Sequence, residues 1–435
     1  MKILSVYNRY LNRGGEDEVF ESEAALLEQH GSEVTLVEEH VAAPSSVRRK
    51  IILSLNATWS REWYARFQEL LSSARPDIVH IHNLVPNFSP SVLYACRQAN
   101  VPVIHTLHNY RLLCPASTLF RDGHLCEECI DHSLWRGVRY GCYQGSRPGT
   151  AAVAMMLGLH RLLGTWADTV DCYLVPSEFA RQKFVRGGLP AEKIVVKPNF
   201  VEPDPGTGPS NENRNGHDND CALFVGRLSP QKGIRTLLAA WEQLTFPLVV
   251  VGDGPLSCLL EEPQPRSPAV TYRGRLSRDQ TLAAMKQARF LVVPSEWYES
   301  FGLIIVEAFA SGVPVLCSRL GAMEEIVEDG RTGLHFTAGD AGDLAAKVRW
   351  AWDHPDEMRG MGRNARSEYE AKYTAERNYE MLYDIYQRVL TNAKPRHSQV
   401  RASSAVLPVD MIASPGPKDG GRVASIPLDR QQPEG

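Results

Sequence analysis

Two basic side chains in the segment FVGRLSPQKG, residues 224–233, are placed to bind an anion. Arg227 and Lys232 flank a loop that opens at Gly226, directly after an apolar run, and a helical pattern follows. Cations at a strand end beside a helix N-terminus suit a phosphate group, and a glycine lets a ligand approach the backbone closely. An ordinary turn with two solvated charges is the alternative interpretation.

A second segment, residues 294–314, contains three glutamates, of which Glu299 and Glu307 are the candidate site residues. It predicts a strand end, a turn and a helix over Phe301–Ser311. That helix is apolar on nearly every side, which indicates burial, yet Glu307 lies in its middle. A buried carboxylate needs hydrogen-bond donors, which sugar hydroxyls or a salt bridge to a neighbouring helix would supply. Glu299 lies about two turns earlier and would face the same ligand.

The first half of the chain offers a glycine pair and a histidine. Gly14 and Gly15 stand between the first predicted strand and helix, where they permit close approach to a phosphate or sugar, or simply form the turn. His108 follows a buried strand and is expected to face a ligand cleft. Asn83 and Asn109 are candidates to line the part of that cleft that would bind a second substrate, the acceptor. For three other histidines we expect a structural role: His80, His82 and His105.

A cysteine-rich insert, residues 111–145, is a candidate metal site. Its four cysteines are Cys114, Cys126, Cys129 and Cys142. The Cys-x2-Cys core with flanking thiols fits a structural zinc or iron–sulfur site, and His124 or His132 would be able to replace one thiol. Four unrelated thiols in a loop are the alternative.

The elements that must position these residues alternate in type along the first half. Strands are predicted at Lys2–Tyr7, Ser32–Val37, Asp77–His82, Val101–His105 and Tyr173–Pro176. Helices are predicted at about Glu16–His30, Trp63–Ser73 and Ser91–Asn100. Strands that alternate with helices indicate a parallel sheet covered on both faces.

The alternation restarts after a polar stretch, Glu202–Asp220, which lacks large apolar residues and is predicted to be a flexible linker. Strands are predicted at Ala222–Val225, Leu248–Val251, Val270–Tyr272, Phe290–Val293 and Val313–Cys317. Helices are predicted at Ile234–Gln243, Asp279–Gln287, Phe301–Ser311 and, as one long pattern, about Ala365–Leu390. The remaining tail has no periodicity and is predicted to be disordered.

We therefore predict an α/β protein with two Rossmann-like, doubly wound domains that face each other across a cleft. The boundaries are residues 1–201 for the first domain, 202–220 for the linker, 221–392 for the second domain and 393–435 for the tail. The last helix is expected to pack back on the first domain. Ligands bind at the carboxyl ends of the strands in such sheets, so the chemistry is expected in the cleft.

Composition narrows the function classes. Hydrophobic residues make up 43% of the 435 residues, charged residues 23%, and the net charge is -4, which argues against a nucleic-acid-binding protein. The sequence shows no signal peptide and no apolar run long enough to span a bilayer, so we expect a cytoplasmic protein. Residues 46–59 combine three basic residues with an apolar run. They fit either a peripheral contact at the inner membrane face or a core helix.

The segments GRLSPQKG and ESFGLIIVEAFASGVPV resemble those of the retaining group 1 glycosyltransferases of GT-B fold, also called family 4. The hallmark of that family is a Glu-x7-Glu spacing, which Glu299 and Glu307 match. Further similar segments are GDGP at 252–255, YRGRLS at 272–277 and GAMEEIVEDGRTGLHF at 321–336. The resemblance covers most of residues 220–390.

The resemblance implies a role for each matching position. Arg227 and Lys232 would bind the donor diphosphate, and Glu307 would hold the ribose hydroxyls. Glu299 would contact the transferred sugar. The other implied donor contacts are Gly14, Gly15, His108, Gly226, Arg273, Gly274 and the backbone N–H groups of Ser300, Phe301 and Gly302.

The implied reaction transfers a sugar from a UDP-, GDP- or ADP-sugar to a saccharide or lipid-linked acceptor, in glycan, polysaccharide or glycolipid synthesis. Two cations and a helix N-terminus stabilise the leaving diphosphate, so no cofactor is expected for catalysis. Retention would follow from same-face displacement assisted by the leaving phosphate. A catalytically inactive nucleotide-sugar-binding protein and another GT-B enzyme, such as an epimerase or a phosphorylase, remain alternatives.

Overall fold

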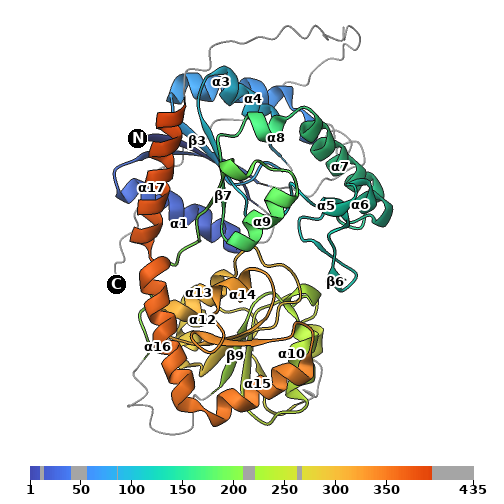
Figure 1. Cartoon of the computed structure of the whole chain (residues 1–435), viewed down its shortest axis with the longest axis vertical. Coiled ribbons are helices and arrows are strands. Elements are labelled where there is room, and N and C mark those ends of the chain that lie inside the picture. Colours follow the sequence, from blue (N-terminus) through green and yellow to red (C-terminus); the bar gives the residue numbers. More distant parts are fainter. Residues whose placement is uncertain (10–13, 41–55, 86, 209–220, 262–266, 394–435) are drawn as a thin grey trace, which may run out of the picture. The chain divides into compact units, whose positions relative to one another are not determined.

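Two parallel six-stranded sheets organise the chain in this computed structural model, which describes residues 1–9, 14–40, 56–85, 87–208, 221–261 and 267–393. The strand order is β2-β1-β3-β4-β7-β8 in the first sheet and β11-β10-β9-β12-β13-β14 in the second. We call the sheet β1–β8 with its helices the first lobe and β9–β14 with its helices the second lobe. This architecture confirms the predicted α/β fold class (Figure 1).

Buried apolar runs form the first sheet. Its strands are β1 (Lys2–Arg9), β2 (Glu33–His40), β3 (Ile78–Ile81), β4 (Val103–Thr106), β7 (Cys172–Val175) and β8 (Ile194–Val196). All four residues of β3, of β4 and of β7 are buried, as expected for parallel strands covered on both faces. The three-residue strand β8 was not predicted, because a run this short has no periodicity to read.

Serine caps start several helices of the first lobe. The main helices are α1 (Gly15–Gln29), α3 (Arg61–Ala74), α4 (Ser91–Gln98), α7 (Arg147–Leu162), α8 (Thr165–Asp168) and α9 (Glu178–Arg186). Ser60, Ser146 and Ser177 each accept a hydrogen bond from a backbone N–H of the first helical turn. α7 and α9 were not predicted, although these serine caps mark both starts.

The cysteine-rich insert folds into short elements. A two-stranded antiparallel hairpin joins β5 (Phe120–Arg121) and β6 (His124–Leu125). The helices α5 (Glu128–Asp131) and α6 (Trp135–Tyr140) follow, and α6 packs against α7. The insert therefore leads directly into α7.

The second lobe repeats the alternation. Its strands are β9 (Ala222–Val225), β10 (Leu248–Val251), β11 (Val270–Tyr272), β12 (Phe290–Val293), β13 (Val315–Ser318) and β14 (Gly333–Phe336). Its helices up to residue 353 are α10 (Ile234–Trp241), α11 (Cys258–Glu261), α12 (Arg278–Gln287), α13 (Leu303–Ala310), α14 (Ala322–Ile326) and α15 (Ala341–Asp353). β14 was not predicted as a strand.

The strand orders place the candidate residues. In the second sheet β9 lies between β10 and β12, so the strand order reverses there, and ligands of such sheets bind at the carboxyl ends of the strands beside that point. The Arg227 loop follows β9, and the Glu299 loop follows β12. In the first sheet β1 lies between β2 and β3, and the glycine pair follows β1.

The C-terminal helical region corrects one prediction. The pattern over Ala365–Leu390 is two helices, α16 (Pro355–Lys372) and α17 (Ala375–Asn392), because Thr374 caps α17 by accepting a hydrogen bond from the Arg377 N–H. A cap in mid-pattern ends one helix and begins the next. Figure 1 shows the two helices in succession.

The last helix, α17, packs against the first sheet. Its Leu382, Ile385 and Tyr386 form one buried cluster with apolar residues of β1, β3, β4 and β7. No helix within the described ranges is long and apolar enough to cross a membrane. Residues 46–55 of the candidate membrane-contact segment, 209–220 of the predicted linker and 394–435 of the predicted tail lie outside the described residues.

Candidate active site

A loop after β9 presents the two predicted phosphate-binding cations. Gly233 closes this loop with φ of +68°, and a Cβ there would lie 1.7 Å from the Pro294 carbonyl oxygen. Only glycine lets the loop pack against the end of β12 in this way. Arg227 is exposed and pairs with no described residue. Lys232 is half-buried and turns toward Glu299.

Lys232 and Glu299 form an ion pair at the end of β12. Lys232 Nζ lies 2.6 Å from Glu299 Oε1, and Ser295 Oγ donates to the same oxygen over 2.8 Å. Glu299 is 7% exposed. Burial alone would raise its pKa, but the Lys232 charge and hydrogen bond hold the pKa of Glu299 below its ordinary value. The carboxylate is therefore ionised at neutral pH.

Helix α13 opens immediately after this pair. Its N-cap, Gly302, has φ of +98°, and Phe301 is buried in the core, so the helix begins at Leu303 rather than at the predicted Phe301. The backbone N–H groups of residues 301–303 have no acceptor among the described residues. The Ser300 carbonyl accepts a hydrogen bond from Ser177 Oγ over 2.9 Å. The start of α13 therefore offers free donors to an anion.

Glu307 lies inside α13, buried as the apolar pattern indicated. Its side chain is 8% exposed and makes no hydrogen bond or ion pair with a described residue. Burial, with a smaller contribution from the nearby charge of Glu18, raises its pKa to about 7, and Arg278 partly opposes the shift. An unpaired, buried carboxylate suits a ligand that supplies hydroxyl donors.

The carboxyl ends of the neighbouring strands β9, β10 and β11 lie side by side at this edge of the second sheet. The Gly226 N–H donates to the Val251 carbonyl over 3.0 Å, and the Gly252 N–H donates to the Gly274 carbonyl over 2.8 Å. Space remains at Gly226, where the nearest atom to a built Cβ is 3.6 Å away. Arg273 is exposed after β11, with its backbone N–H bound to Val250. The implied donor contacts Arg273 and Gly274 thus lie at the same sheet edge.

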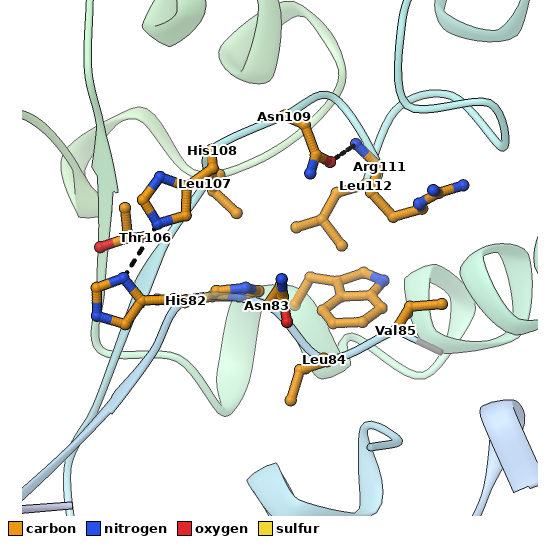
Figure 2. Close-up of a pocket in the computed structure, with 12 residues that line it drawn as sticks. His82, Asn83, Leu84, Val85, Thr106, Leu107, His108, Asn109, Arg111 and Leu112 are labelled. Carbon is orange, nitrogen blue, oxygen red and sulfur yellow. Dashed lines mark hydrogen bonds between the residues drawn. The ribbon is translucent and has the colours of Figure 1, made fainter. Parts of the chain in front are cut away.

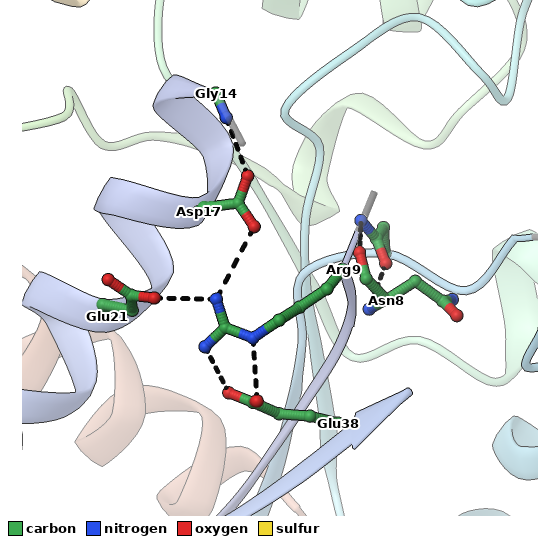
Figure 3. Close-up of polar contacts among 7 residues, drawn as sticks. Asn8, Arg9, Gly14, Asp17, Glu21 and Glu38 are labelled. Carbon is green, nitrogen blue, oxygen red and sulfur yellow. Dashed lines mark hydrogen bonds and ion pairs between the residues drawn. The ribbon is translucent and has the colours of Figure 1, made fainter. Parts of the chain in front are cut away.

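The glycine pair of the first lobe is fixed by a network around Arg9 (Figure 3). The Gly14 N–H donates to Asp17 Oδ2 over 2.9 Å, and Arg9 lies 3.7 Å from the other carboxylate oxygen of Asp17. Arg9 also binds the carboxylates of Glu21 and Glu38. Across from this turn, Leu303 Cδ2 lies 3.9 Å from a Cβ built on Gly15. The pair therefore lies beside the start of α13.

His108 follows β4 and lines a pocket of the first lobe with His82, Asn83 and Asn109 (Figure 2). Its side chain is 6% exposed, and burial lowers its pKa to about 4, so the imidazole is neutral at pH 7. His108 Nε2 lies 3.0 Å from His82 Nδ1, with the two rings stacked. His82, expected to be structural, thus acts directly on the candidate histidine.

A buried ion pair sets the tautomer of these rings. Glu23 Oε2 lies 2.8 Å from Lys197 Nζ, and Glu23 Oε1 lies 3.5 Å from His82 Nε2. Burial raises the pKa of Glu23, but the charge of Lys197 outweighs it and lowers this pKa overall, so the carboxylate is ionised. A proton on His82 Nε2 is then favoured. In that tautomer His108 Nε2 would donate to His82 Nδ1, which leaves His108 Nδ1 as an acceptor.

Ligand atoms of Glu23, His80 and His82 lie within 4.8 Å of one another, a spacing compatible with a metal ion. Lys197 already supplies the neutralising positive charge to the carboxylate. His80 is occupied as well, by Tyr386 OH and Thr106 Oγ1, each over 2.7 Å. We therefore interpret the group as a hydrogen-bonded core network.

Both predicted acceptor-side asparagines have structural partners. Asn83 accepts the Asn8 N–H over 2.6 Å and donates back to the Asn8 carbonyl over 3.2 Å. Asn109 Nδ2 donates to Glu16 Oε1 over 2.9 Å. Sequence reasoning missed Trp166, which also lines the pocket and whose indole N–H has no acceptor among the described residues. An aromatic residue outside any motif gave no signal of this role.

The four predicted metal-binding thiols gather only in part. Cys114 and Cys129 are buried, and a hydrogen bond from the Cys129 thiol lowers the pKa of Cys114 to about 6. Cys126 and Cys142 lie near enough to influence the pair electrostatically. All four are described residues, but no three of their sulfurs lie within 4.8 Å of one another. The metal site stays a prediction.

Two family models match successive parts of the chain. Residues 13–205 match Glycosyltransferase Family 4, and residues 210–368 match Glycosyl transferases group 1. The second match contains the Arg227 loop, the Lys232–Glu299 pair and α13. The chain belongs to the group 1 glycosyltransferases.

Curated relatives of this group 1 glycosyltransferase match it over part of their length. An uncharacterized glycosyltransferase of Methanocaldococcus jannaschii is 31% identical over 40% of this chain and 49% of its own. The D-rhamnosyltransferase WbpZ of Pseudomonas aeruginosa is 31% identical over 35% of this chain and 41% of its own. A glycogen synthase of Mycobacterium tuberculosis is 28% identical over 68% and 64%. The chain thus spans about half the length of the first two.

Solved structures match nearly the whole glycosyltransferase chain in fold. Sucrose-phosphate synthase from Thermosynechococcus elongatus has a TM-score of 0.67 at 19% identity and covers 90% of this chain and 99% of its own. HepE of Anabaena, in complex with UDP-glucose, has a TM-score of 0.58 at 18% identity, over 89% and 100%. The two-lobed fold is therefore that of GT-B glycosyltransferases.

Proposed function

We propose that this chain transfers a sugar from a nucleoside-diphosphate sugar to an acceptor hydroxyl, with retention at the anomeric carbon and without a catalytic metal. One observation carries the proposal. The Lys232–Glu299 pair stands beside the free N–H groups of α13, while the buried Glu307 on the same helix has no partner among the described residues.

Each part of a nucleotide sugar has a complementary group. Arg227, Lys232 and the start of α13 bind the diphosphate, whose negative charge grows as the glycosidic bond breaks. Glu307 accepts the ribose hydroxyls, and Glu299 accepts hydroxyls of the sugar. Neutral His108 accepts a further sugar hydroxyl through Nδ1, in the tautomer that His82 favours.

The reaction needs no covalent enzyme intermediate. The acceptor oxygen forms a bond to the anomeric carbon on the face from which the diphosphate leaves, and the carbon–oxygen bond to that diphosphate breaks. The proton of the acceptor hydroxyl passes to the departing phosphate oxygen. The Glu-x7-Glu resemblance supports retention, and the two cations take the electrostatic role of a metal ion.

The proposed partners follow from the same groups. UDP-, GDP- and ADP-sugars are the donor candidates, and the UDP-glucose complex of HepE favours trying uridine first. Saccharides and lipid-linked saccharides are the acceptor candidates, in glycan or polysaccharide synthesis. We propose a cytoplasmic location with a peripheral contact at the inner membrane face.

Release of nucleoside diphosphate from a donor panel, with and without saccharide acceptors, tests this function. We expect one base to support transfer and a product with the donor's anomeric configuration in the nuclear magnetic resonance spectrum. Lys232→Met and Glu299→Gln should each lower kcat about 100-fold or more, because each removes a charge that acts on the transition state. Lys372→Met, on the exposed end of α16, is the matched control.

Other outcomes would reject the proposal. A free epimer formed without acceptor would indicate an epimerase, and donor binding without turnover would indicate an inactive binding protein. The proposed structural metal has a separate test. Elemental analysis should find zinc or iron in the wild type and lose it in the Cys126→Ser/Cys129→Ser variant.

A further inference from the structure

Helix α7 exposes a stripe of large apolar side chains. Met155 is 55% exposed, Leu159 40% and Leu162 86%, and Leu163 directly after the helix is 56% exposed. The spacings of four and three residues place the first three on one face. Single exposed apolar residues are normal, but four along the C-terminal half of one helix form a patch that indicates a binding surface.

The core does not account for this stripe. The opposite face of α7 already supplies Val153, Met156 and Leu157 to the core of the first lobe. The helix is therefore anchored without its exposed residues, and its stripe remains available to something outside the described residues.

Exposed aromatic side chains lie on segments that pack against α7. On the adjacent helix α6, Trp135 is 61% exposed and Tyr140 is 43% exposed. Trp59 is 41% exposed at the other end, where His160 of α7 binds the carbonyl of Thr58 over 2.9 Å. Tryptophan and tyrosine favour the boundary between water and lipid, because each combines an apolar ring with a polar atom.

The charge of the α6–α7 segment has one sign, although α5, which packs against α6, carries Glu128 and Asp131. Residues 132–167, which span α6 and α7, contain four arginines and no aspartate or glutamate. Arg136, Arg139 and Arg147 are exposed. The whole chain has a net charge of -4, so this positive segment is a local departure from the average.

We propose that the α6–α7 surface docks on an anionic phospholipid bilayer. The apolar stripe enters the boundary between headgroups and acyl chains, and the exposed arginines bind the anionic headgroups. The charge pattern selects this occupant, since a neutral apolar partner would gain nothing from three exposed arginines with no acidic residue between them.

The docking surface continues toward the pocket of Figure 2. Arg161 of α7 donates to the Leu112 carbonyl over 2.6 Å, and both Leu112 and Trp166 of the adjoining α8 line that pocket. A lipid-linked acceptor held at the membrane would therefore present its sugar near His108. This consequence rests on the proposed transfer activity, but the docking itself does not.

Flotation with vesicles tests the docking independently of activity. The full chain should float with vesicles that contain phosphatidylglycerol and float much less with phosphatidylcholine alone. Leu159→Glu/Leu162→Glu should abolish flotation, and each of Arg136→Gln and Arg139→Gln should weaken it about fivefold. The matched control is Tyr383→Glu, an exposed aromatic on α17, which should float like the wild type.

Thermal unfolding of each variant separates lost docking from lost folding, and transfer to a water-soluble acceptor should be unchanged in Leu159→Glu/Leu162→Glu. The proposal is wrong if the wild type does not float, or if it floats equally well with both vesicle types. It is also wrong if Leu162→Glu instead breaks a dimer measured by light scattering, because the stripe would then be a contact between two copies.

Discussion

At the scale of single residues, Glu307 should make donor binding depend on pH. Its pKa of about 7 describes the protein without ligand, and ribose hydroxyls donate best to the ionised carboxylate. Affinity for a nucleotide sugar should therefore fall as the pH drops below about 7, by up to about tenfold per unit. Titration calorimetry with the intact nucleotide sugar measures this, since that ligand has no phosphate that titrates near pH 7.

The stability of the unliganded protein should depend on pH in the opposite direction. The pKa of Glu307 is raised above its ordinary value of 4.5, so its contribution to stability is complete below about 4.5 and is lost as the pH rises through about 7. Glu307→Gln should bind the donor more weakly but without the pH dependence. An unchanged slope in that variant would assign the dependence to another group.

The buried pair Glu23–Lys197 should be sensitive to loss of one partner. Lys197→Met leaves the Glu23 carboxylate buried without its cation, and we expect a loss of about 3–5 kcal/mol of unfolding free energy. Glu23→Gln/Lys197→Met should recover much of that loss, because no unpaired charge remains. Guanidinium unfolding at pH 7 gives both values. Equal losses in the single and double variants would show that the charge itself is not the cause.

The sequence predicted those site residues that chemistry marks by type and spacing. Arg227, Lys232, Glu299 and Glu307 stand out because charges in apolar surroundings need a reason. The contact between Lys232 and Glu299 joins residues 67 positions apart and needed the fold. Glu23 was missed for the same reason, since its partner Lys197 directly follows β8, at the far end of the first lobe's sequence.

At the scale of elements, Gly233 should be irreplaceable in the loop between β9 and α10. In Gly233→Ala the new Cβ would meet the Pro294 carbonyl oxygen at 1.7 Å, so the loop must shift and carry Lys232 away from Glu299. Donor affinity and turnover should fall together. Gly339→Ala is the matched control, because its φ is similar at +79° but no atom lies within 4 Å, and Gly339 is not a candidate site residue. It should cost only about 1–2 kcal/mol of stability.

Circular dichroism and donor calorimetry on both variants separate the effect of backbone strain at a positive φ from that of the steric clash with Pro294. Comparable losses in donor affinity would mean that backbone conformation, rather than the contact with Pro294, determines the loop.

Strand prediction succeeded where a strand is an unbroken apolar run. Strands such as Phe290–Val293 and Leu248–Val251 have the predicted bounds. The strand β8 has only three residues, and in β14 Gly333 and His335 interrupt the apolar run. The break between α16 and α17 was missed because Tyr373 and Thr374 continue the polar and apolar alternation, and only the cap of Thr374 separates the helices.

At the scale of the whole molecule, α17 ties the end of the chain to its beginning. Tyr386 binds His80, and Asn378 accepts a hydrogen bond from Lys197 over 2.9 Å. The helix that follows the second lobe therefore completes the network behind His108. No pattern in the sequence specifies such a pairing, because apolar faces of helices are interchangeable until the topology chooses among them.

The proposal that the two lobes bind different parts of the donor gives a last prediction. If the second lobe binds the nucleotide and His108 of the first lobe contacts the sugar, His108→Ala should weaken binding of the nucleotide sugar but not of the nucleoside diphosphate. Ligand at about 100 times its dissociation constant stabilises the native state by about 2.7 kcal/mol, which a thermal shift detects. The variant should keep the shift with the diphosphate and lose part of the shift with the sugar nucleotide. Glu307→Gln should lose both. Equal loss of both shifts in His108→Ala would mean that the first lobe binds the nucleotide as well, and the assignment of sugar and nucleotide to separate lobes would fail.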